Sequence, residues 1–382
     1  MIQPFKLSEV TLDERIEVFD QLGRILKRYL GSSPSQVKTL TKQSTGIKDS
    51  QFSVLESIIE NSVEEAGILN PWFTRQNILT ALSGISRILT RKNLENWLYK
   101  YNPALLSPEI PLKIGVIMAG NIPLVGFHDF LCILMAGHRF TGKLSSRDDR
   151  LLPMVSRLIS LINSNLNEYV EFTDERLSGT DAIIATGSNN TYRYFDYYFG
   201  KYPHIFRKNR NGAAILNGNE TPDQLAGLGD DIFTYFGLGC RNISKIFVPE
   251  KYEFKKFLEA LERFSYVTEH NKYMNNYQYF RSVYLLNRIP HYDNGFLLLK
   301  QDTSYNSPVG VLFYEYYSSM EMLKEKLVTD GDLLQCITAI EIPGLKTVPF
   351  GKTQFPELWD YADNINTIDF LINLWKKTEH DL

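Results

Sequence analysis

The chain has 382 residues, of which 43% are hydrophobic and 22% are charged, and its formal net charge at pH 7 is −3. This length and composition are typical of a globular protein with roughly two domains, each with its own core. With this small net charge, nothing points to binding of nucleic acid or of an acidic membrane surface. The three cysteines, Cys132, Cys240 and Cys336, are too few and too scattered for a disulfide framework or a zinc site.

The N-terminal sequence, Met-Ile-Gln-Pro-Phe-Lys, lacks the basic and then apolar pattern of a signal peptide. The longest apolar run, residues 122–137, is too short to span a bilayer and contains His128 and Asp129. We therefore expect a cytoplasmic protein with reduced thiols and no transmembrane segment.

The first hundred or so residues predict a helical region. Thr11 and Glu14 have the spacing of a capping box, ahead of an amphipathic stretch that ends at Gly31. Residues 31–50 have the composition of a loop. Apolar residues then recur every three or four positions, which predicts helices over residues 51–66, 74–89 and 92–101.

Beyond Pro111, short apolar runs alternate with longer amphipathic stretches. Strands are predicted over residues 113–118, 139–143, 169–172 and 182–185. Helices are predicted over residues 122–136, 150–166 and 190–199. This alternation is typical of parallel βαβ units, whose ligands bind at the carboxyl ends of the strands.

The alternation begins again near residue 213. Strands are predicted over residues 213–216, 245–248, 296–300, 309–313 and 334–340, and helices over residues 222–236 and 251–263. The sequence thus predicts an α/β protein in three parts. These are a helical N-terminal region with a dinucleotide-binding domain (1–212), a cysteine-containing catalytic domain (213–348) and a C-terminal segment (349–382).

The strongest chemical signal is the segment Tyr-Phe-Gly-Leu-Gly-Cys-Arg-Asn-Ile-Ser-Lys, with Cys240 at its centre. Gly237 and Gly239 allow the backbone to bend sharply and a substrate to approach closely. Arg241 and Lys245 follow, and a nearby cation favours the nucleophilic thiolate. A cysteine in this setting can attack an acyl carbon and hold it as a thioester.

Three weaker signals lie where predicted strands end. Asn121 can donate to an oxyanion, although asparagine at such a turn is more often a helix cap. Lys143 and Ser145 could bind the ribose or 2′-phosphate of a dinucleotide. The alternative interpretation is a surface lysine followed by a serine that caps a helix. Gly187 and Ser188 precede a helix whose N-terminus attracts phosphate.

Taken in order, these segments resemble the aldehyde dehydrogenase superfamily and, more closely, the LuxC-type fatty acyl-CoA reductases. The resemblance rests on Gly120-Asn-Ile-Pro123, Gly142-Lys-Leu-Ser-Ser146, Ala185-Thr-Gly-Ser-Asn-Asn190 and Gly237-Leu-Gly-Cys-Arg-Asn242. It covers roughly residues 65–250 and, more loosely, the chain to its end.

The resemblance implies an aldehyde-dehydrogenase-like fold, with a Rossmann-like cofactor domain and a second α/β catalytic domain. It implies that Cys240 accepts the acyl group and that the side chain of Asn121 and the backbone N–H of Cys240 form the oxyanion hole. The implied reaction is reduction of a fatty acyl-CoA to a long-chain aldehyde. An acyl-activating partner, an acyl-protein synthetase, is an alternative acyl donor, and a homo-oligomer is expected.

The implied cofactor is NADPH. By the resemblance, Lys143 and Ser145 contact its adenosine side, and Gly187 and Ser188 face its pyrophosphate. Aldehyde-oxidising relatives carry a water-activating glutamate in a Glu-Leu-Gly-Gly segment, whereas residues 206–212 here contain no carboxylate. This difference favours acyl reduction over aldehyde oxidation. A second cofactor motif, Glu-Ile-Phe-Gly-Pro, is replaced by Ser-Pro-Val-Gly at residues 307–310.

Other functions remain open from the sequence. A related enzyme could reduce short acyl-CoA or acyl phosphate. An acyltransferase or thioesterase could use Cys240 without a nucleotide, and a non-catalytic subunit of a fatty-acid reductase complex could simply bury it.

The remaining reactive side chains have structural interpretations. Cys132 and Cys336 lie in apolar runs and are expected to be buried. His128 is expected to be a core or helix residue rather than a base oriented by Asp129. The basic cluster of residues 207–210 is expected to be a solvated face, with phosphate recognition as the alternative.

Overall fold

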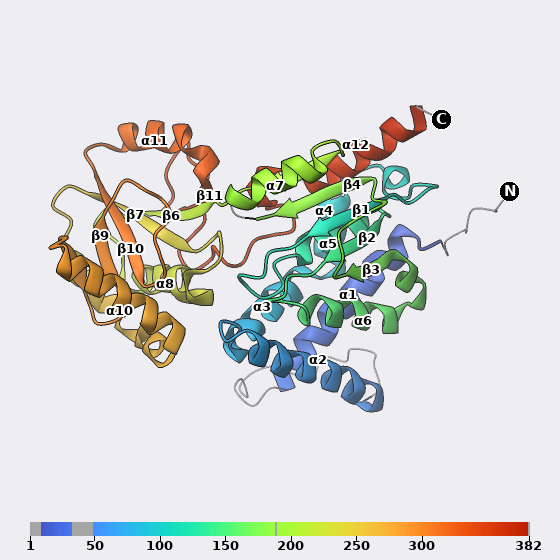
Figure 1. Ribbon diagram of the computed structural model, residues 1–382, viewed down its shortest axis with the longest axis horizontal. Coiled ribbons are helices and arrows are strands. Elements are labelled where there is room, and N and C mark those ends of the chain that lie inside the picture. Colours follow the sequence, from blue (N-terminus) through green and yellow to red (C-terminus); the bar gives the residue numbers. More distant parts are fainter. Residues whose placement is uncertain (1–8, 33–48, 188, 381–382) are drawn as a thin grey trace. The chain divides into compact units, whose positions relative to one another are not determined.

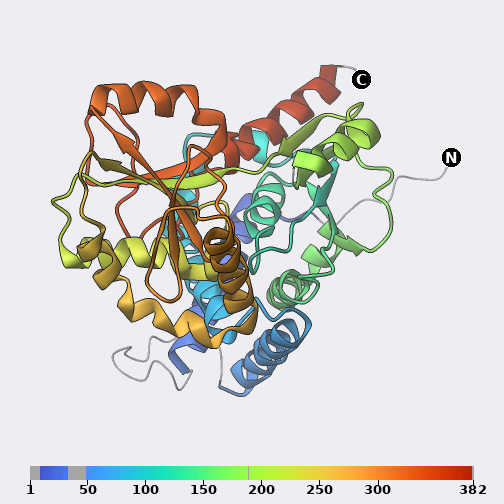
Figure 2. The ribbon, with the colours of Figure 1, turned by 60° about the vertical axis from the view of Figure 1, so that its left-hand side comes forward.

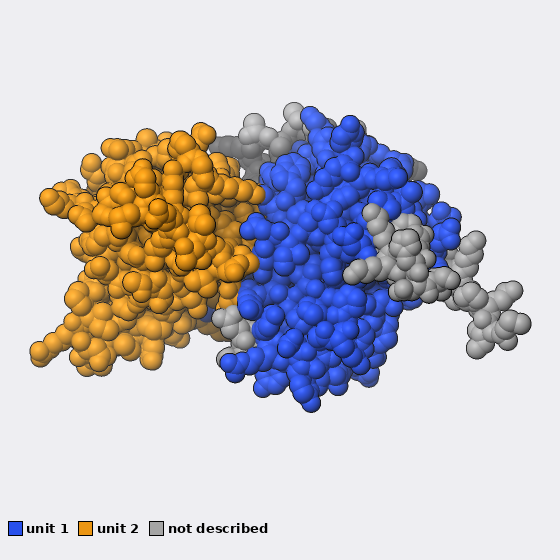
Figure 3. Space-filling view, turned by 90° about the horizontal axis from the view of Figure 1, so that it is seen from above, with its two compact units in different colours: residues 1–208, 357–382 blue, residues 209–356 orange. Residues whose placement is uncertain are grey.

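The computed structural model describes residues 9–32, 49–187 and 189–380. The chain forms two compact units, coloured separately in Figure 3. Unit 1 comprises Met1–Lys208 and Glu357–Leu382, and unit 2 comprises Asn209–Pro356. Each unit contains a mostly parallel sheet with helices packed on it, so the predicted α/β class is confirmed.

Unit 1 begins with a helical region. Its helices are α1 (Leu12–Ser32), α2 (Asp49–Leu69), α3 (Arg75–Ile88) and α4 (Arg91–Leu98). The predicted capping box is present, because the Glu14 N–H donates to the Thr11 hydroxyl at 3.3 Å and the Thr11 N–H donates to the Glu14 carboxylate at 2.8 Å. Most of the loop expected over residues 31–50 lies outside the described residues.

The sheet of unit 1 has five parallel strands in the order β3-β2-β1-β4-β5. The strands are β1 (Lys113–Ile117), β2 (Arg139–Lys143), β3 (Val170–Thr173), β4 (Ala182–Thr186) and β5 (His204–Arg207). All but β5 are predicted by the sequence. The strand order reverses at β1, which lies between β2 and β4, and ligands bind at the carboxyl ends of strands at such a point.

Helices cover both faces of this sheet (Figure 1). They are α5 (Phe127–Met135), α6 (Leu151–Ile162), α7 (Asn189–Phe199) and, from the C-terminus, α12 (Thr367–His380). Phe195 and Phe199 of α7 pack with Ile183 on one face. The alternating residues Ala182 and Ile184 face a larger core that contains α1 and α5. This alternation follows from the two-residue period of a strand.

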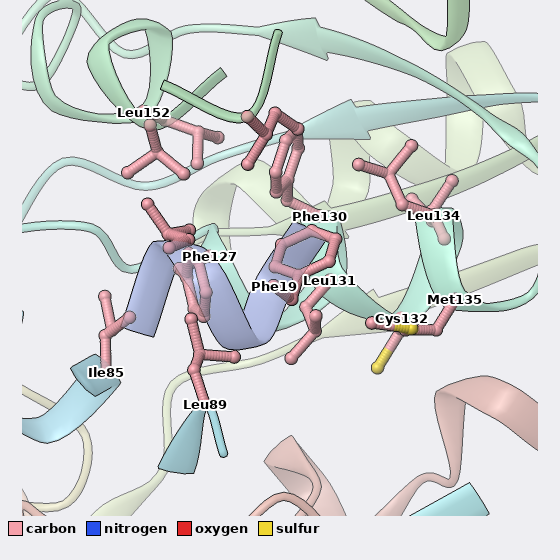
Figure 4. Packing of buried hydrophobic residues seen from close by; sticks show 14 of the residues in the cluster. Phe19, Ile85, Leu89, Phe127, Phe130, Leu131, Cys132, Leu134, Met135 and Leu152 are labelled. Atoms are coloured by element: carbon pink, nitrogen blue, oxygen red, sulfur yellow. The ribbon is translucent and has the colours of Figure 1, made fainter. Parts of the chain in front are cut away.

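The larger core is nearly solvent-free around α5 (Figure 4). Phe130 lies edge-on to Phe19 of α1, with ring centroids 6.3 Å apart. Cys132 of the same helix is fully buried, as expected from its apolar run. Because the Cys132 thiol is buried, its pKa is raised well above the ordinary value, so it stays protonated as a core group.

Unit 2 contains a six-stranded sheet in the order β11-β6-β7-β10-β9-β8 (Figures 1 and 2). The strands are β6 (Asn211–Ile215), β7 (Ile243–Pro249), β8 (His291–Asp293), β9 (Leu298–Gln301), β10 (Val311–Tyr317) and β11 (Leu334–Ala339). The described pairs are parallel except β8 with β9.

The helices of unit 2 are α8 (Pro222–Phe233), α9 (Phe254–Ala260), α10 (Asn271–Leu286) and α11 (Met320–Thr329). Helix α10 packs against β9 and β10, and α11 packs against β6 and β11. Short 3-10 helices in the two units cover Pro103–Leu106, Ser164–Tyr169, Thr234–Gly237, Glu262–Glu269, Gly331–Leu333 and Ala362–Asn364.

The units divide the chain differently from the expected domains. The expected boundary between residues 212 and 213 falls inside β6, whereas unit 2 begins at Asn209. The expected C-terminal segment is split, because residues from Glu357 onward return to unit 1, where the Trp97 indole donates to the Tyr361 hydroxyl at 2.7 Å. Within the described ranges, no helix combines the length and the apolar character needed to cross a bilayer.

Candidate functional site

Cys240 lies in a tight turn between α8 and β7, and it is exposed to solvent. The Asn242 N–H donates to the Gly239 carbonyl at 3.0 Å, which closes a four-residue turn with Cys240 and Arg241 in the middle. One alternative from the sequence is a non-catalytic subunit in which Cys240 is buried. Cys240 is exposed, so this alternative loses the burial on which it depends.

The Cys240 turn lies at the amino edge of the unit 2 sheet, because β7 begins just after it. Strand β10 pairs with β7, so the segment 307–310 that precedes β10 lies at the same edge. The Ser244 hydroxyl donates to the Tyr305 carbonyl at 2.7 Å and links the two connections. The segment 307–310 is therefore a neighbour of the cysteine-bearing loop.

The backbone before Cys240 is strained. Tyr235, Phe236 and Gly237 are consecutive residues in the left-handed region, with φ of 54°, 56° and 76°. Glycine adopts this conformation freely, whereas other residues lose roughly 1–2 kcal/mol each. Phe236 is anchored by packing, with its ring centroid 4.2 Å from that of His270. Strain of this kind persists only where the surroundings hold it, and it concentrates at functional sites.

The two cations that follow Cys240 have structural partners. Lys245 is fully buried, and its ammonium pairs with Glu315 and donates to the Thr303 carbonyl at 2.8 Å. Burial lowers the pKa of Lys245, and the Glu315 carboxylate opposes that shift. Lys245 therefore forms a buried ion pair between two strands of the sheet. This corrects the interpretation from the sequence, in which Lys245 activates the thiol. The Arg241 guanidinium donates to a backbone carbonyl, that of Thr353.

A buried carboxylate at the end of α8 supports the same region. Asp231, at the end of α8, is 1% exposed and accepts hydrogen bonds from the Gly351 N–H at 2.7 Å and the Thr353 N–H at 2.9 Å. Burial raises its pKa to about 6. Through Thr353, Asp231 joins α8 to the residue that follows Cys240. Asp231 could not be predicted as a site residue, since an isolated aspartate in an amphipathic helix gives no signal in the sequence.

In unit 1, two of the predicted site segments are brought together. Asn121 is half-buried in the turn between β1 and α5, and Ser145 follows β2. A Cβ at Gly120 would lie 2.8 Å from the Cβ atoms of both Ser145 and Arg147, so only glycine permits this approach. The turns after β1 and β2 are therefore packed directly against each other.

A second carboxylate that the sequence analysis missed joins these two turns. The Leu124 N–H donates to Asp148 at 2.9 Å, and Leu124 has a left-handed φ of 58°. The Leu151 N–H approaches the other carboxylate oxygen of Asp148 at 3.4 Å. Burial raises the pKa of Asp148 to about 6. Asp148 thus fixes the turn that carries Asn121 to the start of α6.

Lys143 and Gly187 lie at the carboxyl edge of the same sheet. The Lys143 ammonium donates to the carbonyls of Asp174 and Glu175, both at 3.1 Å, just beyond β3. Gly187 follows β4, and a Cβ there would lie 2.9 Å from the Phe195 ring. Ser188 lies outside the described residues.

The sequence interpretation of the basic cluster is wrong for Arg207. Arg207 and Asp129 are both 6% exposed at the side chain and form a two-pronged ion pair, with a third hydrogen bond from Arg207 to the Thr367 hydroxyl. Burial opposes the charge, but the Asp129 carboxylate raises the pKa of Arg207. His128 of α5 is half-buried and bonds the Leu358 carbonyl at 2.9 Å, so its expected structural role as a hydrogen-bonded helix residue is confirmed.

The carboxyl edge of unit 1 suits a dinucleotide. Its turns after β1 and β4 contain glycines in close contact with neighbouring side chains, and α7 begins directly after β4. A helix N-terminus at a strand-order reversal favours a pyrophosphate. Among the described residues, no group of three histidine, cysteine or acidic side chains could hold a metal ion.

No family model and no curated protein matches the sequence. Solved structures do match. Aldehyde dehydrogenase 21 from Physcomitrella patens, in complex with the product succinate, covers 96% of this chain and 89% of its own at 11% identity, with a TM-score of 0.57. An aldehyde dehydrogenase of Bacillus cereus in complex with NAD+ covers 90% and 79% at 13% identity, with a TM-score of 0.55. An NADP-dependent enzyme of E. coli covers 90% and 80% at 12% identity, with a TM-score of 0.56.

These similarities concern the fold, because the sequence identities are very low. They extend over both units, since at least 90% of the chain is covered in each of the three comparisons. The predicted architecture is therefore confirmed, and the chain has an aldehyde-dehydrogenase-like fold.

Proposed function

We propose that this protein reduces fatty acyl-CoA to an aldehyde with NADPH, through an acyl-thioester on Cys240. The observation that carries the proposal is the exposed Cys240 turn at the amino edge of the unit 2 sheet, in a chain with an aldehyde-dehydrogenase-like fold. The resemblance of the segments around Asn121, Lys143 and Gly187 to those of the LuxC-type reductases supports the narrower assignment.

The proposed reaction begins with attack of the Cys240 thiolate on the acyl carbonyl. Asn121 and the Cys240 backbone N–H stabilise the oxyanion of the tetrahedral intermediate. Collapse of this intermediate breaks the bond to CoA, which leaves as a thiolate and takes up a proton. The acyl group is then held by Cys240 as a thioester.

The residues at the carboxyl edge of unit 1 would hold NADPH, with Gly187 toward its pyrophosphate and Lys143 and Ser145 toward its adenosine side. When bound, NADPH supplies the hydride that reduces the thioester carbonyl. The resulting thiohemiacetal on Cys240 loses the thiolate and releases the aldehyde, which returns the cysteine to its starting state. One acyl-CoA, one NADPH and one proton thus give one aldehyde, CoA and NADP+.

Reduction is favoured over hydrolysis because the segment that carries a water-activating glutamate in aldehyde oxidisers lacks a carboxylate here. Its side chains have other partners. Arg207 pairs with Asp129, and Arg210 donates to the carbonyls of Gly331 and Leu334 at 3.2 Å. An acyl-Cys240 would therefore persist until it is reduced.

The test is the loss of NADPH absorbance with a series of acyl-CoA thioesters, run beside the Cys240→Ala protein. Turnover that requires Cys240 and rises with chain length would support the proposal, while a maximum at short chains would change the substrate class. Release of free fatty acid without NADPH consumption would indicate a thioesterase. Transfer to an added alcohol or thiol would indicate an acyltransferase.

The acyl donor is tested in the same experiment. If acyl-CoA gives no turnover, an acyl phosphate, an acyl adenylate or an acyl group carried by a partner synthetase replaces it. NADPH and NADH are compared at equal concentrations, because the assignment of NADPH rests on the resemblance and on Lys143.

A further inference from the structure

The side chain of Asn242 occupies a central place in the Cys240 turn. Asn242 is 2% exposed. Its Oδ1 accepts the Gly239 N–H at 2.8 Å, while its own N–H donates to the Gly239 carbonyl at 3.0 Å. The two hydrogen bonds run in opposite directions between the same pair of residues, so they fix both ends of the turn on which Cys240 stands.

The amide nitrogen of Asn242 reaches back to the end of α8. It donates to the carbonyls of Thr234 at 2.7 Å, Asp231 at 3.0 Å and Ile232 at 3.4 Å. The carbonyls of Asp231 and Ile232 are among the last of α8, which have no partner within the helix, and Thr234 is its C-cap residue. The amide therefore bonds on both of its sides, and its oxygen and nitrogen cannot be exchanged without loss.

The contacts of Asn242 bracket the strained segment. Thr234 precedes Tyr235, Phe236 and Gly237, the three left-handed residues, and Gly239 follows them. Without the amide, the segment could relax toward ordinary backbone angles, and the thiol would move with it. Such strain needs a local restraint, and Asn242 is bonded at both ends of it.

We propose that Asn242 is a positioning residue for Cys240: its amide holds the strained segment and presents the thiol in the orientation needed for attack on an acyl carbonyl. This inference rests on the proposed acyl-cysteine chemistry. Acyl transfer depends on the alignment of nucleophile and carbonyl, because small displacements of a reacting group slow a reaction strongly.

The test measures acylation of Cys240 without any nucleotide. p-Nitrophenyl octanoate is mixed rapidly with the full-length protein, and the burst of nitrophenolate gives the acylation rate, with Cys240→Ala as the blank. We expect Asn242→Ala and Asn242→Asp to acylate at least tenfold more slowly than wild type. Asn242→Asp keeps the acceptor for Gly239 but places a second oxygen against the carbonyls of α8. Acylation of both variants within twofold of wild type would overturn the proposal.

A stability-matched variant separates positioning from general destabilisation. Leu327 of α11 is 3% exposed in a core cluster of the same unit. Leu327→Ala is expected to lower Tm at least as much as Asn242→Ala, because it leaves a cavity. All rates are measured well below each Tm. Leu327→Ala should acylate at the wild-type rate, and an equal slowing in both variants would assign Asn242 a purely structural role.

Failure of the proposed function is distinguishable from failure of this inference. If wild type shows no burst, the acyl-cysteine chemistry is contradicted. Asn242 is then judged by amide hydrogen exchange of the peptide that contains residues 238–242. Asn242→Ala should speed exchange there at least tenfold without changing the β10 peptide, and unchanged exchange would overturn the positioning role.

Discussion

The two candidate sites are built on opposite edges of their sheets. In unit 1, Asn121, Ser145 and Gly187 follow the carboxyl ends of parallel strands. In unit 2, Cys240 precedes β7 and lies at the amino edge. The first arrangement is the general binding edge of α/β sheets, so topology alone points to it. The second depends on a particular strained turn, which topology does not provide.

The supporting interactions differ in the same way. The unit 1 turns are held by close glycine packing and by Asp148, whereas the Cys240 turn is held by Asn242 and by Asp231 through Thr353. A binding edge can be assembled from loops that pack on one another. A nucleophile also needs a fixed backbone, and the structure supplies it through buried polar side chains.

The largest expected effect separates the two sites completely. Cys240→Ala should slow acyl-CoA reduction at least 1,000-fold, because Cys240 carries the acyl intermediate in the proposed reaction. NADPH affinity, measured by quenching of protein fluorescence, should change less than twofold. Cys336→Ser is the control and should keep activity within threefold, because the serine hydroxyl can still donate to the Arg241 carbonyl that the Cys336 thiol contacts at 3.7 Å. Activity above a few per cent in Cys240→Ala would contradict the assignment of the nucleophile.

Asn121→Ala tests whether unit 1 also contributes to the chemistry. We expect kcat to fall roughly 100-fold, as when one oxyanion donor is removed, with little change in NADPH affinity. Asn163→Ala is the control for loss of an asparagine cap in the same unit, because Asn163 caps a 3-10 helix by accepting the Asn165 N–H at 3.1 Å. If Asn121→Ala lowers Tm as Asn163→Ala does but leaves kcat intact, Asn121 is only a cap.

Two glycine substitutions, one in each unit, test whether cofactor binding and acylation depend on different turns. In Gly187→Ala the new methyl would lie 2.9 Å from the Phe195 ring, in the turn proposed to face the pyrophosphate, so NADPH affinity should fall about tenfold while the p-nitrophenyl octanoate burst is kept. In Gly212→Ala the methyl would lie 2.6 Å from the Asn242 carbonyl oxygen, so the burst should slow about tenfold while NADPH affinity is kept. The separation of the two sites would be refuted if the unit 1 variant slowed the burst and the unit 2 variant weakened NADPH binding. It would also be refuted if each variant changed the burst and the NADPH affinity equally.

The smallest expected effect concerns pH and stability. Burial raises the pKa of Asp231 to about 6, so its stabilising, protonated form is fully present below about pH 4 and is lost as pH rises through about 6. Between pH 5 and 7 this group should remove about 1 kcal/mol of unfolding free energy. Urea denaturation of wild type and Asp231→Asn at both pH values measures the difference. Identical pH dependence in the two proteins would contradict the raised pKa.

Much of the fold could be predicted because its elements carry clear local signals. The capping box of Thr11 and Glu14 marks α1, and short apolar runs bounded by glycine mark β1 and β4. Helix α10 was missed. Its segment, from Asn271 to Leu286, is rich in tyrosine and asparagine, which are modest helix formers, and its apolar residues follow no single face. Helix α11 and the short strands β5 and β8 were missed as well.

The candidate site was predicted only where the chemistry is local. Cys240 and Asn121 stand beside glycines, and Gly187 is itself one, at connections between strands and helices, so their segments are visible in the sequence. Asp148, Asp231 and Asn242 act through backbone groups that only the folded chain brings near. Arg207 was misjudged for the same reason, because its partner Asp129 lies 78 residues away in the sequence.

The most direct test of the account follows the acyl group itself. The full-length protein is incubated with tetradecanoyl-CoA, and the mass of the Cys240 peptide is measured before and after addition of NADPH. The account predicts a tetradecanoyl adduct on Cys240 that disappears with release of one equivalent of aldehyde. It is contradicted if Cys240 remains unmodified while aldehyde is formed, or if the adduct is released as free fatty acid whether or not NADPH is present.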